Sequence, residues 1–397
     1  MSDMSGVRAL KPSVLAVVRW PVGGLRTWCK YVYGSGAFER LSIHLLMPRY
    51  EESMDLAEEL APHGVESTLL VDAESPSAFM VAVAKEILSG RHSLVHAHGF
   101  TSALASYLPS KARSLPLVVT PHDMILDGQY RDAKGRVARW LIGYVLKRAT
   151  TVHAVSAASA RNLRVAFPGA FKRRGHIVTA TNGIDVGKFS YAKTQLVRDR
   201  YGIPADAVLV GYFGRYMAPK GFRYIVDAIA ENVERSRGDA NVFVLAVGSD
   251  GFRREEQEAI VSRGLDRWFR FVDYSPEIAG LIKAVDVVVM PSLWEACGLL
   301  AMEAMVAGVP VVLSDCDALL DVAQGSPAVT VKRQDALGIL AAISSQATEV
   351  ARRAANDYST IAAGRFDVQK TAFSVREIYL GAMAEKGGKT SGLQAKP

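Results

Sequence analysis

Two glutamates eight residues apart lie where an apolar strand gives way to a helix. The segment VDVVVMPSLWEACGLLAMEAMVAGVP predicts a strand up to Met290, a loop over Ser292–Cys297 and a helix that begins near Gly298. Glu295 falls in the loop and Glu303 in the second turn of the helix. Helix N-termini attract anions such as phosphate, and carboxylates accept hydrogen bonds from hydroxyl groups. This spacing fits a sugar diphosphate, although two carboxylates that only stabilise a helix N-terminus remain the alternative.

A second group of charged residues follows an apolar run upstream. The run Val208–Phe213 predicts a strand, and Gly214 after it permits close approach of a backbone or a ligand. Arg215 and Lys220 follow at the carboxyl end of this strand, before a helix that Gly221 opens. Two fixed cations at such a place would stabilise a diphosphate leaving group. Because basic loop residues are most often only solvated, that alternative also stays open for this pattern alone.

Apolar, β-branched runs alternate with helix-length stretches along the whole chain. Runs such as VDVVVMP and VPVVLS are continuous, which indicates strands buried on both faces. Strands separated by helices predict parallel sheets with right-handed crossovers. The predicted strands are Val14–Val18, Ser42–Met47, Ser67–Val71, Leu94–His98, Leu117–Thr120, Thr151–Val155, His176–Ala180, Val208–Phe213, Val242–Val247, Phe269–Val272, Val285–Met290, Pro310–Leu313 and Ala328–Val331.

This pattern restarts near residue 205 and predicts an α/β fold of two doubly wound, Rossmann-like domains facing a central cleft. The change falls between Asn182 and Gly202, where the turn sequence TNGID precedes a polar stretch. We expect one domain over residues 1–187 and a second over residues 188–366. We expect a helix over 367–384 that packs back on the first domain, and a disordered tail over 385–397, which is rich in Gly and Lys.

Charge is divided unevenly between the two halves. Residues 1–187 contain 22 Lys and Arg against 15 Asp and Glu, together with all eight histidines, whereas the remainder is balanced at 25 against 25. The basic half should therefore meet an anionic partner. The chain has no zinc-finger pattern and no basic pattern interleaved with aromatic residues, so we do not expect that partner to be nucleic acid.

The three cysteines, Cys29, Cys297 and Cys316, are widely spaced and form no C-x-x-C pair. They predict neither a disulfide framework nor a zinc site, which favours a reducing cytoplasm. The start of the chain lacks the apolar core of a secretory signal, and no apolar run approaches the ~18–20 residues of a membrane span. We therefore expect a cytoplasmic protein.

Residues 130–150 predict a basic amphipathic helix. Trp140, Leu141, Ile142 and Val145 accompany the cations Arg131, Lys134, Arg136, Arg139, Lys147 and Arg148. Basic helices with aromatic residues lie on anionic membrane surfaces, so we expect peripheral contact with the inner face of a membrane. The alternative is that the apolar side is ordinary core and the charges are its wet face.

Taken together, these motifs resemble the retaining glycosyltransferases of the GT-B fold, glycosyltransferase family 4. The donor signature PS-x-x-E-A-C-G-L-x-x-x-E-A-M follows GYFGR-x4-KG, and VHAHGF, VVTPHDM, VHAVSAASARNL and TATNGID occur upstream in the order of that family. The resemblance runs from about Val14 to about Tyr379. It implies an N-terminal acceptor domain and a C-terminal donor domain for a nucleotide-sugar.

The resemblance also implies roles in the donor domain. Arg215 and Lys220 would bind the donor diphosphate, Glu303 the ribose and Glu295 the donor sugar. The remaining donor-binding residues implied by the family are Gly214, Ala296, Cys297, Gly298, Leu299 and, beside the base, Tyr274.

In the acceptor domain, the resemblance implies that Gly23 and Gly24 open a helix toward the diphosphate. His122 would lie against the donor sugar and His98 at another position of the cleft. Asp123 would orient His122 or cap a following helix. For each histidine, a satisfied loop residue is the simpler alternative.

The chain departs from the family pattern at Ala296 and Cys297, where Gly-Phe or Ser-Phe is common. Asp321 stands near the usual place of a further Glu. Asp315 and Asp317 form a D-x-D pattern, which in this fold is out of place for a metal. We expect no metal and no cofactor, because Arg215 and Lys220 supply the positive charge.

These features predict retaining transfer of a hexosyl group from a UDP- or GDP-sugar to a glycan or lipid-linked acceptor, in polysaccharide or lipopolysaccharide biosynthesis. Glu295 would hold a ring hydroxyl and so lie on the wrong side for double displacement, which favours a same-face route. The alternatives are a GT-B nucleotide-sugar epimerase and a non-catalytic nucleotide-sugar-binding protein. A Rossmann dehydrogenase is disfavoured, because no G-x-G-x-x-G follows the first strand.

Overall fold

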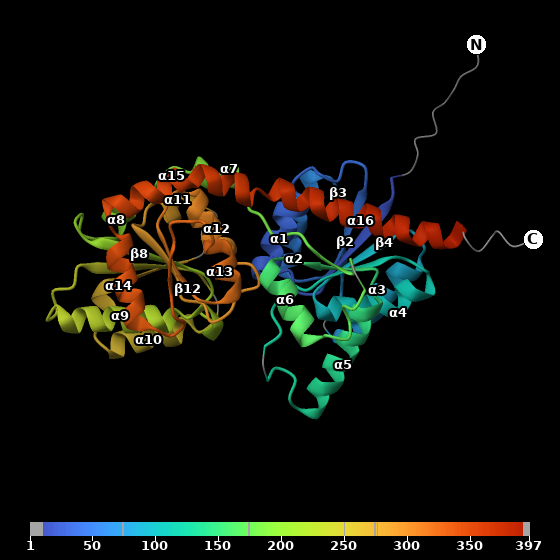
Figure 1. Cartoon of the computed structure of the whole chain (residues 1–397), viewed down its shortest axis with the longest axis horizontal. Coiled ribbons are helices and arrows are strands. Elements are labelled where there is room, and N and C mark those ends of the chain that lie inside the picture. Colours follow the sequence, from blue (N-terminus) through green and yellow to red (C-terminus); the bar gives the residue numbers. More distant parts are fainter. Residues whose placement is uncertain are drawn as a thin grey trace, which may run out of the picture. The chain divides into compact units, whose positions relative to one another are not determined.

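The computed structural model describes residues 11–391 except 74, 127, 174, 250, 274 and 276, and it does not describe the side chains of 387–391. The chain divides into two compact units (Figure 1). Unit 1 comprises Met1–Thr181 and Val368–Pro397, and unit 2 comprises Asn182–Asp367. The division therefore falls six residues before the expected boundary at 187.

The described part of unit 1 contains a seven-stranded parallel sheet in the order β3-β2-β1-β4-β5-β6-β7. Its strands are β1 (Ser13–Val18), β2 (Ser42–Pro48), β3 (Val65–Val71), β4 (Leu94–His98), β5 (Leu117–Thr120), β6 (Thr151–Ala154) and β7 (Ile177–Thr179). Its helices are α1 (Gly23–Tyr33), α2 (Glu51–Leu60), η1 (Ala61–His63), α3 (Pro76–Leu88), α4 (Phe100–Ala112), α5 (Ala133–Arg148), α6 (Ala157–Ala166) and α16 (Val368–Ser391).

Both faces of this sheet are covered, which explains the continuous apolar runs. In β1, Leu15 and Val17 belong to a core formed with α3, α4, α5 and α6, whereas Val14, Ala16 and Val18 belong to a core formed with α1, α2 and α16. Successive strand residues point to opposite faces, so a strand with helices on both sides is apolar at every position.

The C-terminal helix α16 belongs to unit 1. Ala372, Val375 and Tyr379 are buried in the core of α1 and α2, and Thr371 Oγ1 donates to the Thr181 carbonyl at 2.8 Å. Figure 1 shows α16 in red at the end of the colour sequence. The helix continues to Ser391, so residues 385–391 are helical where we expected a disordered tail, and residues 392–397 lie outside the described part of the chain.

The described part of unit 2 contains a six-stranded parallel sheet in the order β10-β9-β8-β11-β12-β13. Its strands are β8 (Val208–Phe213), β9 (Val242–Val247), β10 (Phe269–Val272), β11 (Val287–Met290), β12 (Val311–Ser314) and β13 (Val329–Val331). Its helices are α7 (Val186–Ser190), α8 (Val197–Tyr201), η2 (Ala218–Lys220), α9 (Phe222–Arg235), α10 (Arg253–Ser262), η3 (Asp266–Trp268), α11 (Ile278–Lys283), α12 (Leu299–Val306), α13 (Asp317–Ala323), α14 (Ala336–Gln346) and α15 (Glu349–Phe366).

The prediction of two doubly wound α/β domains is confirmed. Each sheet has the Rossmann-like order in which a central strand is flanked on one side by the next two strands of the chain and on the other by the fourth. The strand order reverses between β1 and β4 in unit 1 and between β8 and β11 in unit 2. Ligands of such sheets bind at the carboxyl ends of the strands on either side of this reversal. Among the described helices, none is long and apolar enough to cross a membrane.

Candidate functional site

Two loops of unit 2 meet at the reversal point of its sheet. One loop follows β8 and contains η2, and the other follows β11 and leads to α12. The Leu293 N–H donates to the Pro219 carbonyl at 2.8 Å. Gly221 has φ +70°, and a Cβ there would lie 2.1 Å from the Pro291 carbonyl oxygen. The two loops are therefore in direct backbone contact, which fixes the side chains between them.

This contact makes Gly221 a sensitive position. Gly221→Ala should destabilise the protein by about 2–5 kcal/mol, because alanine is strained at positive φ and its Cβ would overlap a backbone oxygen. Gly202 has φ +60° with nothing near its missing Cβ, so Gly202→Ala should cost only about 1–2 kcal/mol. Urea unfolding of both variants measures the difference, and equal costs would contradict the tight contact at Pro291.

Lys220 and Glu295 form an ion pair across these loops. Lys220 Nζ lies 2.7 Å from Glu295 Oε1, which also accepts from Ser292 Oγ at 2.9 Å. The Lys220 side chain is 33% exposed and that of Glu295 only 11%. The sequence predicted both residues for the site, and the structure brings them together. It also adds Ser292, whose contact with Glu295 was not predicted from the sequence.

Arg215 lies at the start of the same loop. Its carbonyl accepts from the hydroxyl of Tyr212 at 2.8 Å, and within the described residues its guanidinium has no hydrogen-bond or ion-pair partner. The backbone of the preceding Gly214 packs directly against Gly248. A Cβ added to Gly248 would lie only 2.0 Å from the Gly214 carbonyl oxygen. The backbone around Arg215 is therefore closely packed while its charge remains available.

The helix α12 begins at the other side of the ion pair. Gly298 is its N-cap, with φ +81° and no side-chain cap, and a Cβ there would lie 2.7 Å from the side chain of Leu319. This agrees with the helix start predicted at Gly298. Cys297 is buried, which raises the pKa of its thiol to about 12. The thiol is therefore neutral at physiological pH and acts as a small apolar side chain.

Glu303 is buried in the second turn of α12, as predicted. Burial raises the pKa of its carboxyl to about 7, although the charge of Lys188 on α7 acts in the opposite direction. In the part of the chain that the structure describes, this carboxyl has no hydrogen-bond partner. A buried carboxyl that lacks donors is costly to ionise unless a ligand supplies them.

The D-x-D pattern has a local explanation. The carboxylate of Asp315 lies 3.1 Å from Lys332 and 3.1 Å from Arg333. Burial raises the pKa of Asp315, but hydrogen bonds from Arg333 and Lys332 outweigh it, and the pKa is lowered overall. Asp317 begins α13. Within the described residues, no group of three His, Cys, Asp or Glu side chains is placed to hold a metal ion.

Arg333 also reaches the loop of the ion pair, a contact that could not be predicted from the sequence. Its Nη1 donates to the Leu293 carbonyl at 3.4 Å, and Ser314 Oγ donates to the Ser292 carbonyl. These bonds connect the ends of β12 and β13 to the loop after β11. Tyr274, expected beside the base, lies outside the described residues.

In unit 1, the predicted histidines also meet at the reversal point of a sheet. His98 ends β4 and His122 lies just after β5, with His98 Nδ1 2.9 Å from His122 Nε2. Gly23 and Gly24 open α1 after β1, as predicted. Asp123 accepts from the Met124 N–H at 2.8 Å, and because the next helix begins at Ala133, its carboxylate caps a loop and no helix.

Comparison with known proteins agrees with this geometry. The model of glycosyl transferases group 1 matches residues 207–348, and the model of the glycosyl transferase 4-like domain matches residues 78–180. Together they match more than half of the chain. With two Rossmann-like units and this site, the protein is a GT-B glycosyltransferase. It belongs to the glycosyl transferases of group 1 with a 4-like N-terminal domain, and it is a nucleotide-sugar transferase.

Curated relatives have related names. The D-inositol 3-phosphate glycosyltransferase of Corynebacterium urealyticum is 28% identical over 75% of this chain and 73% of its own length. The 2-deoxystreptamine N-acetyl-D-glucosaminyltransferase of Streptomyces fradiae is 29% identical over 70% of this chain and 68% of its own length. The crystal structure of Anabaena Alr3699/HepE in complex with UDP-glucose matches with a TM-score of 0.76 and 20% identity, over 93% of this chain and 99% of that one. This last likeness shows the fold.

Proposed function

We propose that the enzyme transfers a hexosyl group, with retention of configuration, from a UDP- or GDP-sugar to a hydroxyl of a glycan or lipid-linked acceptor. The observation that carries this proposal is the Lys220–Glu295 pair beside the start of α12, with the buried carboxyl of Glu303 behind it. Lys220 ends η2, Glu295 lies in the loop after β11, and Glu303 lies in α12. The reversal point of one sheet brings these three residues together.

The diphosphate of the donor would bind to the cations of the first loop. Lys220 is already fixed by Glu295, and Arg215 has no partner among the described residues. The uncapped N-terminus of α12 adds backbone N–H groups. Together these groups would stabilise the charge of the departing diphosphate, so no metal ion or other cofactor is required in this proposal.

The ribose of the donor would bind to Glu303. Its carboxyl lacks donors in the described part of the chain, and two ribose hydroxyls supply them. Hydrogen bonds from hydroxyl groups favour the ionised form and would lower the pKa from about 7. Donor binding should therefore release a proton from this residue near neutral pH.

This proton release predicts a pH dependence of donor affinity. A carboxyl with a pKa of about 7 in the free enzyme should make the Kd for a UDP-sugar about tenfold larger at pH 6 than at pH 8. Calorimetry with a UDP-sugar measures this, because its diphosphate keeps a constant charge over this range. Glu303→Gln should bind with little pH dependence. A wild-type Kd that is flat from pH 6 to 8 would remove Glu303 from the donor site.

For the proposed retention, we favour a same-face route. Oε1 of Glu295 accepts from both Lys220 and Ser292, so this carboxylate is engaged in holding the loops. A double displacement needs a free carboxylate on the opposite face of the sugar, and Glu295 is poorly suited to that task. In the same-face route, the departing diphosphate takes the proton of the acceptor hydroxyl.

A binding panel tests the proposal. UDP, GDP, ADP and NAD are titrated calorimetrically against the wild-type enzyme and Glu303→Ala. Tight binding of one nucleoside diphosphate that the variant loses would support the donor site and identify the base. UDP comes first, because the Anabaena structure holds UDP-glucose. Binding of NAD alone, or of nothing, would overturn the proposal.

Turnover then separates the remaining alternatives. A transferase releases the nucleotide only when an acceptor is present, an epimerase releases it or an altered sugar without one, and a binding protein releases none. Acceptors to screen include lipid-linked saccharides together with D-inositol 3-phosphate and 2-deoxystreptamine, which the names of the relatives supply.

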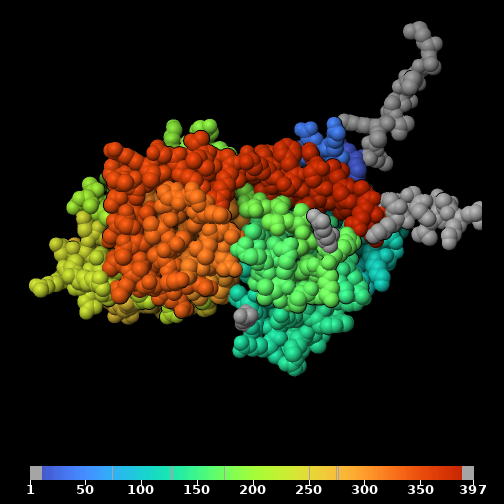
Figure 2. Space-filling model, viewed as in Figure 1, coloured from blue at the N-terminus to red at the C-terminus, as the bar shows by residue number. Residues whose placement is uncertain are grey.

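We also propose that unit 1 contacts an anionic membrane through the outer face of α5. Ile142, Val145 and Leu146 form the inner, core side of this helix, whereas Trp140 points outward and is 65% exposed. The predicted apolar side is thus divided between core and surface. Figure 2 shows the teal segment that contains α5 at the surface of unit 1.

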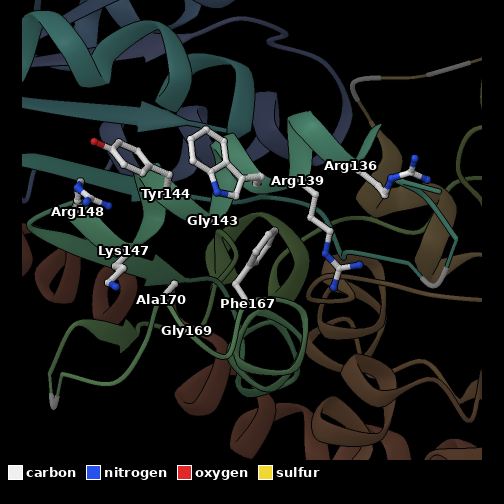
Figure 3. A pocket seen from close by; sticks show the side chains of 10 residues that line it. Arg136, Arg139, Gly143, Tyr144, Lys147, Arg148, Phe167, Gly169 and Ala170 are labelled. Atoms are coloured by element: carbon white, nitrogen blue, oxygen red, sulfur yellow. The ribbon is translucent and has the colours of Figure 1, made fainter. Parts of the chain in front are cut away.

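Cations lie on this face beside Tyr144 and Phe167 (Figure 3). They line a surface hollow of about 520 Å³ with Tyr144 and Phe167. Arg148 lies 3.7 Å from the ring centre of Tyr144, and Arg139 donates to the Ala166 carbonyl. Among the described residues, no carboxylate forms an ion pair with the lining cations, which are Arg136, Arg139, Lys147 and Arg148. Uncompensated cations around an exposed Trp fit anionic headgroups, and they support a cytoplasmic enzyme at the inner face of a membrane.

Vesicle binding tests this contact. The enzyme should float with vesicles that contain phosphatidylglycerol but not with phosphatidylcholine alone, and salt should weaken the association. Lys147→Glu with Arg148→Glu should lower the binding at least about tenfold. Lys193→Glu with Arg254→Glu makes the same charge change on exposed residues of unit 2 and should have little effect. Equal losses in both pairs would reject α5 as the contact surface.

A further inference from the structure

A chain of hydrogen bonds runs through the interior of unit 1. It joins His122, His98, Tyr33, Tyr379, His96, Thr120 and His153, in that order, and ends at the carbonyl of Ala180. The successive distances are 2.9, 2.8, 3.1, 2.6, 2.7, 2.9 and 3.0 Å. We call these seven side chains the histidine network. They come from α1, β4, β5, β6, α16 and the loop after β5.

The network is closed off from solvent except at His122. His96, Thr120, His153 and Tyr379 are fully buried, and Tyr33 and His98 are 2% exposed. The indole of Trp28 packs against all four histidine rings, with centroid distances from 4.8 to 6.2 Å. Because the buried members have little or no solvent contact and bond to one another, we assign one proton to each of these links.

The Ala180 carbonyl fixes the direction of the first bonds. A carbonyl oxygen only accepts, so His153 Nε2 carries a proton and donates it. Burial lowers the pKa of His153 to about 4, so the ring is neutral and its Nδ1 accepts from the hydroxyl of Thr120. Because the Thr120 hydroxyl donates its single proton to His153, its oxygen accepts a hydrogen bond from His96 Nε2.

The same logic continues to the tyrosines. Burial also lowers the pKa of His96 well below its usual range, so the ring has a single proton and its Nδ1 accepts from Tyr379. The proton of the Tyr379 hydroxyl is thereby used. Its oxygen lies 3.1 Å from that of Tyr33 and is stabilised only if the Tyr33 hydroxyl donates to it.

The Tyr33 hydroxyl can donate its proton either to Tyr379 or to His98, and the two resulting networks differ by one hydrogen bond. If Tyr33 donates to Tyr379, then His98 Nε2 donates to Tyr33, and His122 Nε2 donates to His98 Nδ1. Every link then contains one proton. If Tyr33 instead donates to His98, the two tyrosine oxygens face each other at 3.1 Å with no proton between them. A buried link without a proton is the costlier state.

We propose that the histidine network holds His122 as the tautomer with its proton on Nε2, so that Nδ1 accepts a hydrogen bond from a hydroxyl of the transferred sugar. Nδ1 of His122 has no partner among the described residues. Tyr33, His96, His98, Thr120 and His153 are then positioning residues, and Tyr379 brings the C-terminal helix into the same network. The presence of a sugar at His122 rests on the proposed function; its tautomer does not.

The tautomer is measured by nitrogen NMR on protein labelled with ¹⁵N at histidine. The signals of His122 are identified by their absence from the spectrum of His122→Gln. The wild-type enzyme should show His122 neutral, with the proton on Nε2. Thr120→Val removes the hydroxyl that transmits the direction from Ala180, so the rings beyond it should shift toward the other tautomer. Thr120→Ser keeps a hydroxyl and should restore the wild-type spectrum.

Tyr33 and Tyr379 provide a matched pair. Among the described residues, Tyr33 alone connects His98 with Tyr379 and His96, so Tyr33→Phe should leave His122 as a mixture of tautomers. Tyr379→Phe should keep the tautomer of His122, because the Tyr33 hydroxyl lies 3.3 Å from His96 Nδ1 and can donate to it instead. In transfer assays, Thr120→Val and Tyr33→Phe should lower kcat/KM for the donor at least about tenfold, while the KM for the acceptor stays unchanged.

The outcomes separate the two proposals. A wild-type His122 that carries its proton on Nδ1, or a tautomer that Thr120→Val and Tyr33→Phe both leave unchanged, would overturn the histidine network as its determinant. If the expected tautomers are found but their loss does not change donor kinetics, the sugar contact is wrong. If the wild-type enzyme transfers no sugar at all, the proposed function fails while the tautomer assignment stands.

Discussion

Lys220→Ala should lower kcat by about 10²–10³-fold while the enzyme remains folded. In the proposed reaction, negative charge grows on the departing diphosphate, and Lys220 is the cation that Glu295 holds in place at 2.7 Å. A group that is fixed before the reaction stabilises this charge without reorganising. Because the charge grows in the transition state, kcat should fall more than the affinity for the donor.

The control and a conservative variant make this result specific. Lys193→Ala removes an exposed lysine of the same unit and should leave kcat unchanged. Lys220→Arg keeps the charge but changes its shape and should recover only part of the rate. Circular dichroism and the unfolding temperature show whether the loss of the ion pair has disturbed the fold. A folded Lys220→Ala enzyme with a wild-type kcat would remove Lys220 from the mechanism.

Acid should unfold unit 1 steeply, and this is the largest expected effect on stability. Burial, followed by repulsion from neighbouring rings, lowers the pKa of His96 and His98 well below 6.5 and that of His122 to about 3. Burial also lowers the pKa of His153 to about 4, although its hydrogen bond to the Ala180 carbonyl acts in the opposite direction. Below pH 6.5 the unfolded chain takes up protons at these sites and the folded chain does not. The stability is therefore complete above pH 6.5 and falls as the pH decreases, by up to about 1.4 kcal/mol per pH unit for each histidine.

Four such residues together give a slope of up to about 5 kcal/mol per pH unit, which exhausts an ordinary free energy of unfolding within about one to three pH units. Urea unfolding between pH 7 and 4.5, followed by circular dichroism, measures the slope. His153→Gln should reduce it by about 1.4 kcal/mol per pH unit, whereas His63→Gln, on the exposed η1 segment, should not. Stability that does not change between pH 6.5 and 5 would show that the network accepts protons without unfolding.

Glu303 acts in the opposite direction. Its pKa is raised from 4.5 to about 7, so the free enzyme loses stability in unit 2 as the pH rises from 4.5 through 7. A bound donor should remove this loss. The two units therefore have opposite pH limits. The stability that a bound donor adds should increase between pH 6 and pH 8, and this change with pH isolates the contribution of Glu303.

The strands, and the carboxyl ends of the strands at which the site forms, could be predicted from the sequence. Continuous apolar runs occur when both faces of a strand are covered, and helix-length separations require crossovers, so all thirteen predicted strands are found in the two sheets. Glycines with positive φ lie at helix ends, as Gly298 does at the start of α12 and Gly202 at the end of α8. These features depend on local chemistry, which the sequence contains.

Contacts between distant segments could not be predicted in the same way. The pair of Lys220 and Glu295 joins residues 75 positions apart, and Arg333 reaches the same loop from β13. Alternating His96 and His98 indicate one face of a strand, but nothing in the local sequence connects them with Tyr379 on the last helix. Such contacts follow from the order of strands and helices in space, which a single sequence does not fix.

The return of α16 to unit 1 has a consequence for synthesis. The core that contains Tyr33 and Phe38 is completed by Ala372, Val375 and Tyr379, which follow unit 2 in the chain and so leave the ribosome after it. Unit 2 is continuous in sequence and can fold while the chain is still being made, whereas unit 1 must wait with an open apolar face until its final helix emerges. Incomplete chains that end before Val368 would thus expose that apolar face. Chaperones and proteases would act on such chains before they could serve as an enzyme.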